Sequence, residues 1–115
     1  MGDPTPEEVF ELMADEHTRE ILARTSQEPM SAPELVDACD ASERTIYRRL
    51  EDVQALGLVT ETMELHPEGH HRSVYEAKLE TVRIDLEDGR YEVRLQLEED
   101  TADRFARMWK DIRDE

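Results

Sequence analysis

The sequence lacks the features that mark secreted and membrane proteins. It has a single cysteine, Cys39, which excludes an internal disulfide and a zinc site built from several cysteines. No apolar run approaches the roughly 20 residues of a membrane span, and the N-terminus has no basic and then apolar signal pattern. We therefore expect a soluble, cytoplasmic protein that does not bind a membrane.

Basic residues are also scarce. The 115 residues include 14 Arg and Lys against 30 Asp and Glu, which gives a net charge of −16. The acidic residues alternate with periodic apolar ones, so they indicate a folded domain with an acidic coat. A composition with many acidic residues and almost no lysine resembles that of proteins from salt-accumulating halophiles. In molar salt the Debye length falls to about 3 Å, so the negative charges repel each other less. Taken alone, this charge balance argues against DNA binding.

Signatures of catalysis are missing. The sequence has no glycine-rich phosphate loop, no Gly-x-Ser-x-Gly and no His-Glu-x-x-His, and its carboxylates are spread along the chain. His66, His70 and His71 with Glu68 could bind a transition metal, but adjacent histidines on a strand point to opposite faces. We therefore expect no enzyme activity, no metal site and no cofactor.

The first half of the chain has helical periodicity. We expect four helices, one starting at Pro6 and the others at about 15–25, 31–39 and 42–57. Ser31 and Glu34 have the spacing of a capping box, and Ser42 caps the fourth helix, which ends at Gly57. On that fourth helix the apolar spacing predicts one buried stripe, formed by Ile46, Leu50, Val53 and Leu56.

After Gly57 the apolar period changes from helical to alternating. The pattern predicts one hairpin from strands 58–65 and 74–79, and a second hairpin over 81–97 with a turn at Asp88 and Gly89. A last helix is expected from residue 100 or 101 to the C-terminus. Short helices with a tight turn at 40–41, followed by a hairpin, predict an α+β fold of the winged helix-turn-helix type.

Residues 30–50 and 56–59 carry a resemblance to ArsR-like winged helix-turn-helix transcription regulators. Residues 12–22 resemble the opening helix of that family, and residues 69–75 resemble its wing. The whole chain, with its acidic coat, is similar to small ArsR-type regulators of halophilic archaea. The resemblance implies a DNA-binding domain over 1–80 and a dimerisation extension over 81–115, with double-stranded DNA as the partner.

The outward side of the helix at 42–57 is the candidate recognition surface. Arginine can bind a guanine edge with two hydrogen bonds, a contact that contributes about 1–3 kcal/mol of discrimination. The alternative is that these arginines pair with acids on a solvated face. The candidate DNA-binding residues are Ser42, Glu43, Arg44, Thr45, Tyr47, Arg48 and Arg49 on this helix, and His70, His71 and Arg72 in the wing.

The C-terminal helix is the candidate dimer element. The resemblance implies that two copies pair through terminal helices and present their recognition helices to half-sites about 34 Å apart. The apolar stripe could instead pack on its own chain. The candidate interface residues are Phe10, Met13, Phe105, Met108, Trp109 and Ile112.

Two other functions stay open. Winged helices also act as protein-interaction modules that do not read bases. A redox- or metal-switched regulator would use Cys39 or the wing histidines, although metal-sensing relatives carry a Cys-x-Cys pair where this chain has Ser31 and Pro33. We expect Cys39 to be buried and inert.

Overall fold

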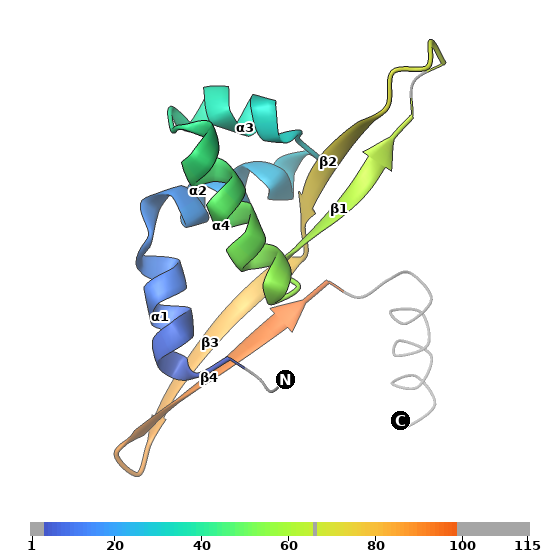
Figure 1. Cartoon of the computed structure of the whole chain (residues 1–115). Helices are drawn as coiled ribbons and strands as arrows, with labels where there is room; N and C mark the ends of the chain where they lie inside the picture. Colours follow the sequence, from blue (N-terminus) through green and yellow to red (C-terminus); the bar gives the residue numbers. More distant parts are fainter. Residues whose placement is uncertain (1–3, 66, 99–115) are drawn as a thin grey trace, which may run out of the picture.

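A computed structural model describes residues 4–65 and 67–98, which form four helices and two separate antiparallel hairpins (Figure 1). The helices are α1 (Pro6–Ala14), α2 (Glu16–Gln27), α3 (Ala32–Cys39) and α4 (Glu43–Ala55). The strands are β1 (Val59–Glu64), β2 (Arg72–Ala77), β3 (Leu79–Glu87) and β4 (Arg90–Leu97). This α+β arrangement confirms the predicted winged helix-turn-helix fold. The predicted C-terminal helix, with Phe105, Met108, Trp109 and Ile112, lies outside the described residues.

Side-chain caps set where the helices begin. Thr5, Asp15, Ser31 and Ser42 each accept a hydrogen bond from the backbone N–H three residues later. At α3 the Glu34 carboxylate also accepts from the Ser31 N–H at 3.1 Å, which completes the predicted capping box. These contacts satisfy backbone donors that a helix cannot pair internally. They confirm the predicted helix starts, while α2 extends to Gln27, two residues beyond the predicted end.

The core forms where α2, α3 and α4 meet the base of the first hairpin. Its fully buried side chains include Ile21, Leu35, Ile46, Leu50, Val53 and Leu58. Three of them, Ile46, Leu50 and Val53, confirm the predicted buried stripe of α4, whereas the fourth predicted residue, Leu56, is the C-cap and is only partly buried. Because this side packs inward, the opposite side of α4 faces solvent.

The first hairpin is joined to the helical part through Tyr75. The N–H of Tyr75 donates to the Met30 carbonyl at 2.7 Å, and the N–H of Met30 donates back at 3.0 Å. The second strand covers Arg72–Ala77, so the prediction of 74–79 was wrong at both ends. The ladder ends there because the N–H groups of Lys78 and Leu79 both donate to the Leu58 carbonyl, and Leu79 then opens β3.

The second hairpin extends from the body in the direction opposite to the wing (Figure 1). Its turn places Asp88 and Gly89 at positive φ, 52° and 76°, as the Asp-Gly pair predicts. Helix α1 contacts this hairpin through β4. Among the described residues, no helix is both long and apolar enough to cross a membrane.

Candidate nucleic-acid interface

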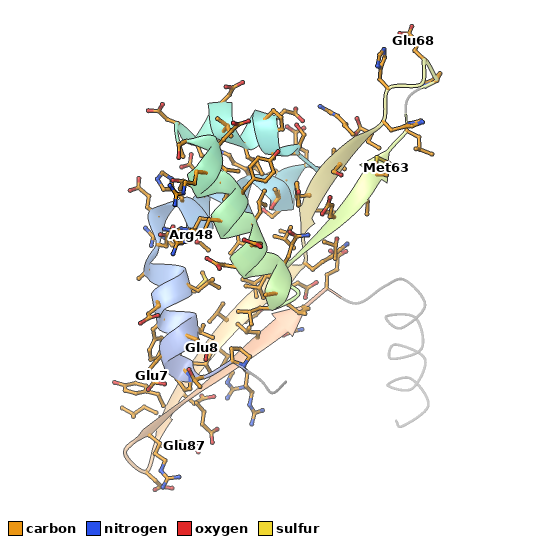
Figure 2. The ribbon with its side chains drawn as sticks, in the orientation of Figure 1. Glu7, Glu8, Arg48, Met63, Glu68 and Glu87 are labelled. Carbon is orange, nitrogen blue, oxygen red and sulfur yellow. The ribbon has the colours of Figure 1, made fainter. Side chains whose placement is uncertain are left out.

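The exposed side of α4 presents two arginines with no protein partner. Arg44 and Arg48 are one helical turn apart and both are exposed. Within the described part of the chain, neither forms an ion pair or a side-chain hydrogen bond. Arg48 projects from the body of α4 (Figure 2). Their guanidinium groups therefore keep all their hydrogen-bond donors available to a ligand.

A groove beside these arginines runs between α4 and β2. Its lining includes Arg44, Tyr47, Arg48, Glu51, Gln54 and Tyr75. Tyr47 is 49% exposed and also lines a second hollow, which lies against α3 and the wing. That second hollow is lined by the carboxylates of Glu34, Asp37 and Glu61 and by Arg72. Glu43, the remaining exposed candidate on the helix, lies in its first turn, where a carboxylate favours the helix dipole.

The N-terminus of α4 is occupied by its own cap. The Ser42 Oγ accepts from the Thr45 N–H at 3.1 Å and donates to the Thr45 Oγ1 at 3.0 Å. Both hydroxyls thus stabilise the start of the helix. They are also placed next to its positive end, where a phosphate would bind favourably.

The Arg49 side chain points toward α2 and away from Arg44 and Arg48. Its Nε donates to the Asp15 Oδ2 at 3.0 Å, and its guanidinium lies 3.9 Å from the Asp52 carboxylate. The Arg49 side chain is only 27% exposed, so it faces the junction of α1 and α2. Partial burial alone would raise the pKa of Asp15, but hydrogen bonds from the Thr18 N–H and from Arg49 outweigh it and lower that pKa. The structure therefore separates Arg49 from Arg44 and Arg48.

In the wing, the predicted residues fall into two groups. His70 and His71 are exposed near the tip. Arg72 lies where the wing loop meets the hairpin ladder, and its Nη1 is 2.9 Å from the Glu34 carboxylate and its Nε is 3.0 Å from Glu64. Hydrogen bonds from Ser31, joined by the Arg72 charge, lower the pKa of Glu34. Arg72 therefore ties the wing to the start of α3.

Cys39 lies in the core and is 5% exposed. Burial raises the pKa of its thiol, and the nearby Glu20 carboxylate raises it further. A thiol of this kind is protonated and shielded, which disfavours attack on an oxidant or a metal. In the described ranges, no three His, Cys, Asp or Glu side chains are grouped to hold a metal ion.

The candidate dimer residues are only partly within the described structure. The Phe10 ring meets the Tyr91 ring edge-on, with centroids 5.8 Å apart, and Met13 packs against the core. The sequence interpretation did not predict that four apolar side chains of the second hairpin, Ile84, Leu86, Tyr91 and Leu97, are exposed. The alternating pattern did show that the hairpin has an apolar face. It could not show how much of that face is covered.

Residues 13–62 match a protein family described as a helix-turn-helix domain. This region contains α2, α3, α4 and most of β1. A search of curated proteins finds no significant match. The match to a helix-turn-helix domain indicates a DNA-binding regulator, in agreement with the two exposed arginines of α4.

Proposed function

We propose that this protein is a sequence-specific transcription regulator that binds double-stranded DNA as a homodimer. Helix α4 enters the major groove, and the wing tip at 66–73 meets the backbone or minor groove. One observation carries the proposal: Arg44 and Arg48 lie exposed and unpaired on the helix that a helix-turn-helix uses for reading. The ArsR-like type, the halophilic source and the cytoplasmic location are part of the proposal, supported by the resemblance and the acidic composition.

The residues divide into reading and positioning groups. Arg44 and Arg48 read bases, with Tyr47 beside them against a phosphate or a thymine methyl. The hydroxyls of Ser42 and Thr45 hold a phosphate at the helix start, and His70 and His71 reach the backbone from the wing. Arg49 and Arg72 are positioning residues, because their guanidinium groups already hold α4 and the wing to neighbouring helices.

The overall charge of −16 opposes DNA binding at low salt. At molar salt the Debye length is about 3 Å, so this long-range repulsion is screened while contacts at hydrogen-bond distance survive. Counterion release, the usual source of affinity, is also weak there. We therefore propose that the affinity for DNA stays constant or rises as the salt concentration increases. A steep loss of affinity between about 1 and 3 M salt would contradict this part.

The test is selection of binding sites from a random duplex library in about 2 M potassium salt, followed by sequencing. We expect an enriched inverted repeat with half-sites one helical turn apart. The Arg44→Ala/Arg48→Ala variant should lose this enrichment. The control, Arg24→Ala, removes an arginine that is ion-paired to Glu20 within α2, away from the α4 surface, and should keep it. Enrichment that survives in the double variant would refute base reading by α4.

Exposed apolar side chains on the second hairpin favour an alternative, a protein-interaction module without base readout. The same selection separates the two, because such a module enriches no sequence. A redox-switched regulator would need an accessible thiolate, which the buried Cys39 does not offer.

A further inference from the structure

A hollow of about 520 Å³ lies between α3, α4 and the first hairpin, and we call it the wing hollow. Its volume is within the range of about 300–1,000 Å³ that is typical of small-molecule sites. Tyr47 of α4 and Tyr75 of β2 line it, and both also line the groove beside Arg44 and Arg48. The charged and aromatic residues that line the wing hollow are Glu34, Asp37, Tyr47, Glu61, Arg72 and Tyr75.

Tyr75 is the buried polar residue of the wing hollow. It is only 6% exposed, and within the described part of the chain its hydroxyl forms no hydrogen bond. Tyr75 is paired with Glu61 across the ladder, so the two side chains lie on the same face of the hairpin. Burial raises the pKa of Tyr75, and the Glu61 carboxylate and Tyr47, which also line the hollow, raise it further. Because a buried hydroxyl normally has a hydrogen-bond partner, Tyr75 offers a donor and an acceptor to a molecule in the hollow.

The charges around the wing hollow are not balanced. Glu34 and Arg72 neutralise each other, since the Arg72 Nη1 lies 2.9 Å from the Glu34 carboxylate. Asp37 forms no hydrogen bond or ion pair with the described residues. Glu61 accepts from the neutral amide of Gln54 at 3.2 Å and, within the same ranges, has no cation beside it. Two carboxylates of the lining are therefore left without a positive partner in the described structure.

Carboxylates alone do not define a site in a chain with 30 acidic residues. The hollow between α1 and α4 also has carboxylates, including those of Glu8 and Glu11, but no aromatic ring is among its described lining residues. The wing hollow combines its carboxylates with the rings of Tyr47 and Tyr75, and aromatic faces attract cations. No three described His, Cys, Asp or Glu side chains are grouped to hold a metal ion, so the lining suits a larger, organic cation.

We propose that the wing hollow binds a small organic cation, an ammonium group carried on an apolar body. The carboxylates of Asp37 and Glu61 bind the ammonium group, which also donates a hydrogen bond to the Tyr75 hydroxyl oxygen. The apolar body packs on the Tyr47 ring. An anion is disfavoured, because the Arg72 guanidinium is already bound to Glu34 and Glu64.

The cation should also act on DNA binding, and this part of the inference rests on the proposed function. Tyr47 lines both the wing hollow and the groove beside Arg44 and Arg48. A Tyr47 ring that packs on the cation is held against the hollow and is less available to a phosphate or a thymine methyl. We therefore expect the cation to weaken DNA binding.

The test is a titration of the isotope-labelled full chain with phenethylammonium, followed by nuclear magnetic resonance in about 2 M potassium salt. Potassium at this concentration competes at any carboxylate that only attracts cations. The matched ligand control is hydrocinnamate, which has the same ring and chain but ends in a carboxylate. We expect phenethylammonium to shift the signals of the lining, residues 31–34, 37, 47, 61, 72, 73 and 75, and hydrocinnamate to leave them unchanged. Shifts spread over the whole chain, or equal responses to both ligands, would overturn the proposal.

Variants of the full chain locate the contacts. Asp37→Asn/Glu61→Gln should weaken phenethylammonium binding about 10-fold, and Tyr75→Phe, which keeps the ring, should weaken it about 5-fold. The matched control is Glu8→Gln/Glu11→Gln, which removes the same charge from the hollow between α1 and α4 and should stay within about 2-fold of the parent chain. Circular dichroism verifies that all variants are folded. An equal loss in the control would show that the cation follows the overall charge, and would overturn the site.

A separate measurement tests the effect on DNA. Saturating phenethylammonium should weaken binding of the parent chain to its selected DNA site at least about 3-fold and should have no such effect on Asp37→Asn/Glu61→Gln. A chain that binds the cation but enriches no DNA sequence would refute the proposed function and leave the wing hollow as a cation site. A chain that binds both without mutual effect would refute the coupling through Tyr47.

Discussion

The ion pair between Asp15 and Arg49 should hold the recognition helix to the α1–α2 junction. Asp15 has two roles, because one oxygen accepts from the Thr18 N–H as the α2 cap and the other accepts from the Arg49 Nε at 3.0 Å. Asparagine caps a helix as well as aspartate does, so Asp15→Asn keeps the cap and removes the charge. Asp15→Ala removes both.

The expected magnitudes follow from these geometries. Exposed ion pairs contribute about 0.2–1 kcal/mol, and both side chains here are only about a quarter exposed, so we expect a coupling near the upper end. Loss of an N-cap costs about 1 kcal/mol more. Asp15→Asn should therefore lower the free energy of unfolding by about 1 kcal/mol and Asp15→Ala by about 2 kcal/mol.

Urea unfolding of the parent chain, Asp15→Asn, Arg49→Met and the double variant at one fixed salt concentration measures the coupling. A coupling near zero would refute the ion pair, and equal losses for Asp15→Asn and Asp15→Ala would refute the separate cap. Because the folded-state pKa of Asp15 is lowered, the charged form adds stability above the unfolded pKa of about 3.9. This stability is lost as the pH falls through the folded value, and Asp15→Asn should remove that pH dependence.

The same variants test the positioning role of Arg49 in DNA binding. Arg49→Met should weaken binding to all sequences alike, because the Arg49 guanidinium is bound to Asp15 at the α1–α2 junction. Arg44→Ala should instead relax the preference at one base position. A change of base preference in Arg49→Met would show that Arg49 reads DNA directly.

Three further predictions concern the fold. Leu50→Ala, at a core site that is 1% exposed, should lower the free energy of unfolding by about 2–5 kcal/mol in urea titrations. Gly89→Ala should cost about 1 kcal/mol by the same measurement, because φ is +76° while no atom lies within 4 Å of an added Cβ, so strain rather than a clash decides the effect. Cys39 should react with a thiol reagent only as fast as the chain opens. Rapid labelling of the folded protein would refute its burial.

Local rules predicted most of the helical part from the sequence. Ser31, Glu34 and Ser42 satisfy backbone groups within three residues of themselves, so their effect does not depend on the rest of the fold. The buried stripe of α4 follows from helical spacing alone. The predicted winged helix-turn-helix is confirmed for these reasons.

Features that depend on distant partners could not be predicted in this way. Arg49 lies at the edge of the buried stripe, and its direction is decided by Asp15, 34 residues earlier in the chain. The end of β2 depends on the carbonyl of Leu58, which accepts from both Lys78 and Leu79. Alternating apolar and charged residues in the second hairpin predict one apolar and one charged face. The packing of α1 on β4 then decides which part of the apolar face is exposed to solvent.

The described arginines fall into two groups. Four of the nine are paired with a carboxylate, namely Arg24, Arg49, Arg72 and Arg83.

Among the described residues, Arg44 and Arg48 form no ion pair, although Glu51 lies three residues beyond Arg48, a spacing at which helical ion pairs form. They also repel each other, because like charges four residues apart on a helix cost about 0.2–0.5 kcal/mol. A polyanion bound along α4 would convert the repulsion into attraction at both positions at once.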